Sequence, residues 1–139
     1  MDEILAANQA FYDAFLAEDE DAMEALWARR APVACIHPGW TALIGRPRVM
    51  ASWRAIMAGG APALRCASPR VHDLGDVAYV ICDELVAGGR LVATNVFVRE
   101  DGQWRIVHHQ AGQVAAVAAP EDEPESDDDD DDAGPPQLN

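Results

Sequence analysis

Apolar residues in the first part of the chain recur with the spacing of α-helices. Within residues 2–17 they come every three or four positions, which predicts an amphipathic helix. An acidic run then interrupts the pattern, and Asp21 followed three positions later by Glu24 resembles the capping box of a second helix, which Pro32 ends. Residues 45–60 have a proline near their start and two glycines at their end, which predicts a third helix.

The remaining apolar segments follow the spacing of β-strands. A short strand is predicted at 33–37, ahead of the third helix. Four long strands follow, joined by glycine-containing dipeptides that suit tight hairpin turns, at 64–72, 77–86, 91–99 and 104–117. Helices followed by such a meander predict an α+β fold, with three N-terminal helices packed on one face of an antiparallel sheet. Because long strands twist and curl, we expect the sheet to be strongly curved and to enclose a pocket.

The negative charge of the chain is concentrated near its C-terminus. Ten of the 24 acidic residues lie between Glu121 and Asp132, so the other 14 face ten arginines and the rest of the chain carries a charge of only −4. Lysine is absent, and no basic stripe could neutralise phosphates, so we expect neither nucleic acid nor a membrane as a partner. Residues 1–118 are expected to form one domain and 119–139 a disordered tail. The tail serves solubility by default; a basic partner or weak cation binding are the alternatives.

Cysteine and histidine usage bears on location and cofactors. The N-terminal residues are acidic where a secretion signal needs positive charge, which predicts a cytoplasmic protein. The cysteines Cys35, Cys66 and Cys82 are odd in number and widely spaced, which indicates buried free thiols. Since the histidines lack the short spacings of metal ligands, we expect neither a metal nor another cofactor.

His37 and Trp40 belong to the segment HPGW, at the end of the first predicted strand. Pro38 and Gly39 turn the chain there, so that Trp40 folds back beside His37, and we expect the pair to form the rim and one wall of the pocket. An imidazole is a suitable general base, so His37 is a candidate catalytic residue. Alternatively, His37 only fixes the turn and Trp40 fills the pocket.

The last predicted strand carries two adjacent histidines, of which one faces the interior. Ile106, His108 and Gln110 share one face, and Arg105 lies on the other. This alternation favours His108 as the second candidate catalytic residue and Gln110 as a ligand-binding residue. Burial of His109 in a dimer interface is the alternative.

Polar residues elsewhere in apolar segments complete the candidate site. Asn95 in a strand needs a hydrogen-bond partner, and Tyr12 on the first helix could send its hydroxyl into the pocket. We consider both as ligand-binding residues, with a structural amide and a core tyrosine as alternatives. Asp83 and Glu84 are adjacent in one strand, and alternation alone does not decide which faces inward. Either could instead form an ion pair with an arginine such as Arg99.

Several segments resemble one family when they are taken in order. They are NQAFYDAFLAEDEDAMEALW, HPGW, LIGRPRVMASWRAIM and ATNVFVREDGQWRIVHHQAG. Over residues 2 to about 117 the chain resembles the SnoaL-like branch of the nuclear transport factor 2 (NTF2)-like superfamily. This resemblance implies a cone-shaped α+β fold, a homodimer formed through the outer sheet face, and a pocket at the wide end.

The relatives that the resemblance implies differ in function. They include ketosteroid isomerase, polyketide cyclases, dehydratases and the association domain of calmodulin-dependent kinase. In many relatives the last strand ends in a run resembling His-His-His-x-Ser, whose third histidine lines the cavity; Gln110 and Gly112 replace two of these residues here. We therefore expect a pocket for a small organic ligand, with isomerase, cyclase or dehydratase activity by acid–base chemistry. A non-catalytic assembly module and a binding-only carrier are the alternatives.

Overall fold

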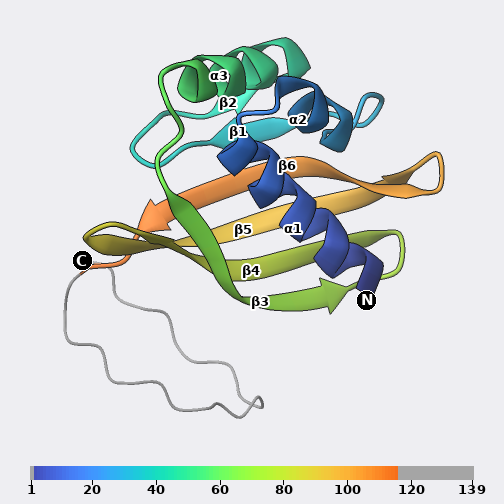
Figure 1. Ribbon diagram of the computed structural model, residues 1–139. Helices are drawn as coiled ribbons and strands as arrows, with labels where there is room; N and C mark the ends of the chain where they lie inside the picture. The colour runs from blue at the N-terminus through green and yellow to red at the C-terminus, as the bar shows by residue number, and fades with distance from the viewer. Residues whose placement is uncertain (1, 116–139) are drawn as a thin grey trace.

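The computed structural model describes residues 2–115, which form three helices and a six-stranded mixed sheet (Figure 1). The helices are α1 (Asp2–Ala17), α2 (Glu20–Leu26) and α3 (Arg46–Ala58). The strands are β1 (Ala34–Ile36), β2 (Leu43–Ile44), β3 (Leu64–Asp73), β4 (Val77–Val86), β5 (Gly89–Glu100) and β6 (Gln103–Gln113). The predicted α+β class is confirmed. The end of the predicted last strand, the boundary after residue 118 and the acidic tail lie outside the described residues.

The sheet has the strand order β2-β1-β6-β5-β4-β3. The four long strands form the predicted antiparallel meander. The expectation of a purely antiparallel sheet was wrong, because β1 pairs with β6 in parallel. This short strand pairs with β6 at the edge of the meander, and the alternation of side chains along a strand carries no information on the direction of such a pairing. The two-residue strand β2, which pairs with β1, was not predicted.

The helix ends show which start and stop signals the chain uses. Asp19 is the N-cap of α2, since its carboxylate accepts a hydrogen bond of 3.0 Å from the amide of Ala22. The predicted capping box of Asp21 and Glu24 was wrong, because both residues lie inside the helix. The chain leaves α1 through Glu18 in the left-handed region (φ 56°), and this places Asp19 rather than Asp21 at the start of α2.

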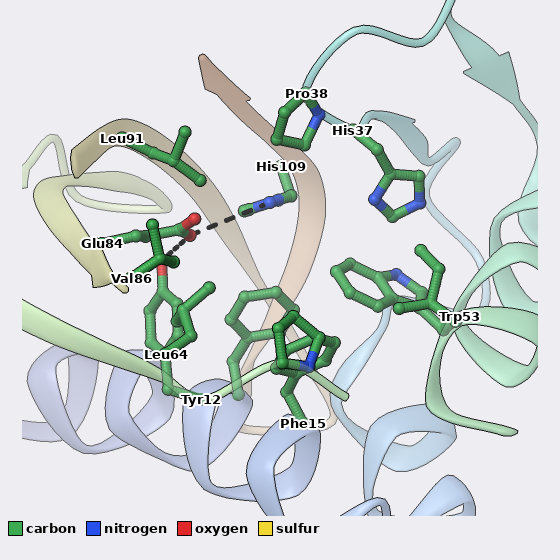
Figure 2. Close-up of a pocket in the computed structure, with 13 residues that line it drawn as sticks. Tyr12, Phe15, His37, Pro38, Trp53, Leu64, Glu84, Val86, Leu91 and His109 are labelled. Atoms are coloured by element: carbon green, nitrogen blue, oxygen red, sulfur yellow. Dashed lines mark hydrogen bonds and ion pairs between the residues drawn. The ribbon is translucent and has the colours of Figure 1, made fainter. Parts of the chain in front are cut away.

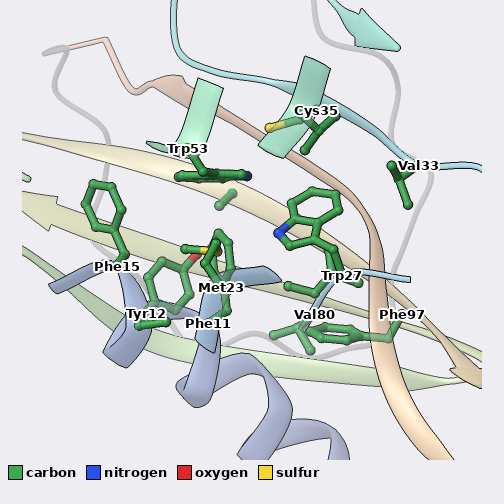
Figure 3. Packing of buried hydrophobic residues seen from close by; sticks show 14 of the residues in the cluster. Phe11, Tyr12, Phe15, Met23, Trp27, Val33, Cys35, Trp53, Val80 and Phe97 are labelled. Atoms are coloured by element: carbon green, nitrogen blue, oxygen red, sulfur yellow. The ribbon is translucent and has the colours of Figure 1, made fainter. Parts of the chain in front are cut away.

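The helices cover one face of the sheet and bury the core against it. Helix α1 crosses the long strands, and α2 and α3 lie toward β6 and the β1–β2 edge (Figure 1). Trp27 and Phe97 are fully buried between these layers, and Phe11 contacts Trp53 edge-to-face with ring centroids 5.3 Å apart (Figure 3). Arg46, at the start of α3, ties this helix to the end of α2 by donating hydrogen bonds of 2.8–3.0 Å to three carbonyls of the segment 24–28.

A β-bulge in β6 changes which side chains face the core. Phe97 pairs with Ile106 but Val96 pairs with His108, so Val107 is an extra residue in the pairing of β5 with β6. The inward row therefore passes from Ile106 to His109, both of which are buried. The inference that His108 faces the pocket was wrong for this reason.

Candidate functional site

A cavity of about 170 Å³ lies between α1, α3 and the end of the β4–β5 hairpin (Figure 2). Most of its wall is apolar and aromatic. The apolar wall includes Phe11, Phe15, Trp53, Leu64, Val86 and Leu91. Its titratable residues are Tyr12, His37, Glu84 and His109, so a few polar groups converge on an otherwise apolar space.

Glu84 of β4 supplies the carboxyl group of the cavity. Its side chain is only 3% exposed, and Tyr12 of α1 donates a hydrogen bond of 2.7 Å to Oε2. Burial raises the pKa of Glu84, and the hydrogen bond from Tyr12 offsets part of that rise. Burial and the Glu84 charge both raise the pKa of Tyr12, so the phenol keeps its proton. Asp83 points to the other side of the sheet, with its carboxylate 4.0 Å from Arg90, so β4 turns Glu84 rather than Asp83 inward.

His109 of β6 faces Glu84 across the cavity, with Nε2 4.0 Å from Oε2 (Figure 2). Its Nδ1 lies 2.6 Å from Oδ1 of Asn95, and Asn95 uses its amide hydrogens for Asn8 (2.9 Å) and the Tyr12 hydroxyl (3.1 Å). Because an amide oxygen only accepts, Nδ1 of His109 carries the proton and Nε2 presents a lone pair to the cavity. Burial lowers the pKa of His109 to about 3, and the nearby His37 adds to this shift. The imidazole is therefore neutral at pH 7.

His37 follows β1 and lies on the cavity wall, beside Pro38. Its Nε2 is 2.8 Å from the hydroxyl of Ser52, which itself donates to the carbonyl of Val49 at 2.8 Å. Nε2 of His37 is consequently the donor to Ser52, and Nδ1 holds the lone pair. Burial lowers the pKa of His37 to about 4. Trp40 packs edge-on against the imidazole, with centroids 4.7 Å apart, but its indole is 46% exposed and lies outside the cavity wall.

The other sequence candidates occupy different surroundings. His108 donates a hydrogen bond of 3.1 Å from Nδ1 to the carbonyl of Ala34, between β6 and β1. Gln110 is exposed, so its assignment to the ligand-binding face was wrong for the same reason as that of His108: the bulge shifts the alternation. Asn95 is fully buried behind the wall, with its polar atoms bonded to protein groups. Sequence reasoning did not single out Ser52, and it named His109 only as the alternative to His108.

Other features of residues 2–115 bear on the expectations about cofactors and membranes. No three histidine, cysteine or carboxylate side chains in this range gather in a metal-binding arrangement. The cysteines in it are free, and Cys35 and Cys82 are buried. Of the helices described, none has the length and apolar character needed to cross a bilayer.

Comparison with known proteins places this chain in a family. A family model described as a SnoaL-like domain matches residues 4–116. The chain belongs to the SnoaL-like family. Two solved structures that cover most of the SnoaL-like chain are similar to it, and one of them is described as a member of the NTF2-like family.

The first of these structures is a candidate dehydratase of the NTF2-like family from Streptomyces avermitilis. It is 33% identical, with a TM-score of 0.76 over 83% of this chain and 96% of that one. The second is a candidate calcium/calmodulin-dependent protein kinase type II association domain from Thiobacillus denitrificans, which is 39% identical with a TM-score of 0.71 over 79% and 94% of the two chains. The SnoaL-like chain is therefore similar both to a candidate enzyme and to a candidate assembly domain.

A curated relative is found in a plant. The F-box protein SKIP8 of Arabidopsis thaliana is 29% identical over 111 residues, which are 78% of this chain. The SnoaL-like chain spans about half the length of that relative, since the match covers 48% of it.

Proposed function

We propose that the protein binds a small, largely apolar organic molecule in the cavity and moves a proton on it, with Glu84 carrying the proton and Nε2 of His109 accepting a hydrogen bond from the substrate. The observation that supports this most directly is the buried carboxyl group 4.0 Å from the lone pair of a neutral imidazole, inside an apolar cavity. A substrate atom that lies beside this pair can be within hydrogen-bond distance of both groups.

Glu84 suits proton transfer because its surroundings raise its basicity. Burial raises the pKa of Glu84 above its ordinary value, whereas burial lowers the pKa of His109 to about 3, so His109 serves as a neutral hydrogen-bond acceptor. In an isomerisation, the Glu84 carboxylate removes a proton from one atom and returns the same proton to a neighbouring atom. In a dehydration, the Glu84 carboxylate takes the proton from carbon and delivers it to the leaving hydroxyl, which departs as water, while Nε2 of His109 accepts a hydrogen bond from the substrate. Similarity to the candidate dehydratase from Streptomyces avermitilis supports this class of reaction.

The remaining polar residues have supporting roles in this proposal. Tyr12 is a positioning residue, since its hydroxyl holds Oε2 of Glu84 at 2.7 Å. Asn95 positions His109 by fixing its tautomer through the 2.6 Å hydrogen bond. His37 contributes a neutral, aromatic part of the wall that contacts the ligand, and Trp40 supports the ring of His37 from outside.

The size of the cavity limits the substrate. Its 170 Å³ are close to the roughly 150 Å³ of an engineered apolar cavity that holds benzene. The proposed substrate is therefore about as large as one substituted ring, and a steroid would have to extend well beyond the cavity.

The test combines a binding screen with an exchange assay. Single-ring compounds are screened by thermal shift, and compounds that bind are incubated with the protein in D₂O while deuterium incorporation is followed by mass spectrometry. We expect incorporation with the parent and a loss of roughly 100-fold or more in Glu84→Gln and His109→Gln. Asp83→Asn removes a carboxylate from the opposite face of the same strand and should exchange like the parent. Equal exchange by Glu84→Gln and the parent would refute the catalytic proposal.

An assembly role is the second candidate function. It is supported by the 39% identity to the candidate kinase association domain and by apolar residues exposed on the sheet, including Val77 (37% exposed) and Val92 (42%). In this case a homodimer forms through the outer sheet face. Sedimentation equilibrium would then give a dimer for the parent and a monomer for Val92→Arg, whereas a parent that stays monomeric at high concentration would exclude this role.

A further inference from the structure

The end of the cavity near Glu84 offers hydrogen-bond acceptors without donors. Tyr12 donates its only hydroxyl hydrogen to Oε2 of Glu84, and Asn95 donates its amide hydrogens to Asn8 and Tyr12. Among the described residues, neither Oε1 of Glu84 nor Nε2 of His109 has a hydrogen-bond partner. These two atoms therefore present lone pairs to whatever enters.

The indole N–H of Trp53 does not supply a hydrogen-bond donor to the cavity. Trp53 belongs to the cavity wall, but its nitrogen is covered by protein on all sides and is turned away from Phe15 (Figure 3). The other buried indole nitrogen without a hydrogen-bond partner in residues 2–115, that of Trp27, belongs to the core and not to the cavity.

The carboxylate of Glu84 also lacks a positive partner in the described part of the chain. Its polar neighbours are the phenol of Tyr12, which also contacts the thiol of Cys82, and the neutral imidazole of His109. Arg90, on the next strand, approaches Asp83 on the outer face instead. A buried carboxylate without a counter-charge is costly, and it is relieved either by a proton or by a cation. The raised pKa of Glu84 reflects the tendency of this carboxyl to take up a proton. A bound cation would relieve the cost of the buried charge without a proton.

We propose that the cavity binds a small primary amine in its ammonium form, with the nitrogen between Glu84 and Nε2 of His109 and a one-ring apolar body against the aromatic wall. One nitrogen with two hydrogen bonds of about 2.8 Å spans the 4.0 Å between Nε2 of His109 and Oε2 of Glu84 at an angle of about 90°, because Oε2 keeps a second lone pair beside the hydrogen bond from Tyr12. An ammonium has hydrogens for both acceptors, whereas a hydroxyl has one. A carboxylate or phosphate on the ligand would bring a second negative charge to a site that contains no cation.

The apolar wall fits the rest of such a ligand. Phe11, Phe15 and Trp53 present aromatic surface within the same 170 Å³, and a cation near an aromatic face gains electrostatic energy that grows when water is excluded. This inference names the ligand class of the proposed function and rests on it in one respect, namely that the cavity admits a small molecule.

The test uses four probes with one ring each and different polar groups. Benzylamine, benzyl alcohol, benzoate and toluene are titrated into the full chain at pH 7.5 by isothermal calorimetry. We expect benzylamine to bind at least about tenfold more tightly than benzyl alcohol, because its hydrogen bonds involve charged groups. Benzoate should bind more weakly than toluene.

Two variants separate the charge inside the cavity from charge in general. Glu84→Gln keeps the size of the side chain and an oxygen for Tyr12, and it should weaken benzylamine binding at least about tenfold while leaving toluene binding unchanged. Asp83→Asn removes a charge from the outer face of β4 and should bind benzylamine like the parent. A thermal melt of each variant checks that it is folded.

The possible outcomes distinguish this inference from the proposed function. If benzyl alcohol or benzoate binds as tightly as benzylamine, or if Glu84→Gln binds benzylamine like the parent, the ammonium site is refuted. Toluene binding without benzylamine binding would also refute it and would leave the cavity of the proposed function standing. Failure of all four probes to bind would overturn both. If the parent binds benzylamine selectively but catalyses no deuterium exchange, only the catalytic part of the proposed function is overturned.

Discussion

Acidification should destabilise the protein because two buried imidazoles are held neutral. The pKa of His37 is lowered to about 4 and that of His109 to about 3. In the unfolded chain both rings bind a proton below about pH 6.5, whereas in the native state they do so only below these lower values. The contribution of these two histidines to the free energy of unfolding is therefore fully present above about pH 6.5. It is lost as the pH falls toward 4 for His37 and toward 3 for His109.

The size of this effect follows from the pKa differences. At pH 5 each histidine reduces the free energy of unfolding by about 2 kcal/mol relative to pH 7.5, so the pair contributes about 4 kcal/mol. Glu84 acts in the opposite direction, because its raised pKa makes the native state bind a proton before the unfolded chain does. The net loss should therefore lie below 4 kcal/mol, which is still a large part of the roughly 5–15 kcal/mol of a typical domain.

Urea unfolding followed by tryptophan fluorescence at pH 7.5, 6 and 5 measures this loss. His37→Gln and His109→Gln should each reduce the pH dependence by about 2 kcal/mol, and comparing slopes removes the general cost of each substitution. In parallel, NMR of the imidazole Cε1–H signals should show that neither ring of the native parent titrates between pH 7.5 and 5. A ring that titrates near 6.5, or a parent whose stability is independent of pH over this range, would refute the reasoning.

Three further substitutions test other parts of the structure by urea unfolding. Glu100 accepts hydrogen bonds of 2.8–2.9 Å from the backbone amides of residues 29–31, so Glu100→Gln should cost about 2–3 kcal/mol; a loss below 0.5 kcal/mol would contradict this role. Phe97→Ala should cost about 3–5 kcal/mol, because the side chain is fully buried, and a cost near 1 kcal/mol would mean that the core is looser than described. Trp40→Ala removes a half-exposed ring and should cost less than about 1.5 kcal/mol, contrary to what a plug of the core would show.

Much of the fold is predictable because its signals are local. Helix α3 begins with Gly45 as its N-cap and Pro47 in its first turn, and it ends at Gly59, as proline and glycine at these places predict. The hairpin glycines Gly75, Gly88 and Gly102 have positive φ values of 75–103°, which these tight turns require. In each case the residue type itself restricts the backbone, so no tertiary information is needed.

Features that depend on tertiary contacts were predicted less well. Asp83 and Glu84 are equivalent for a pattern of period two, and only the packing of α1, which brings Tyr12 to one face of β4, distinguishes them. The parallel pairing of β1 with β6 likewise depends on how the chain returns to the sheet. The polar network from Asn8 through Asn95 to His109 joins residues up to 101 positions apart in the sequence, and no periodicity connects them.

The β-bulge at Val107 explains why the candidate site differs from its prediction more than the rest of the fold does. An unbroken alternation places His108 inside, and a single extra residue in β6 moves every later side chain to the opposite face. With the bulge, His109 meets the oxygen of Asn95 and the carboxyl group of Glu84, while His108 bonds to β1. Bulges are common beside active sites because they redirect a side chain without changing the rest of the sheet. In this protein the adjacent histidines make the shift consequential, since the bulge selects which imidazole is buried and neutral and which one joins β6 to its parallel neighbour.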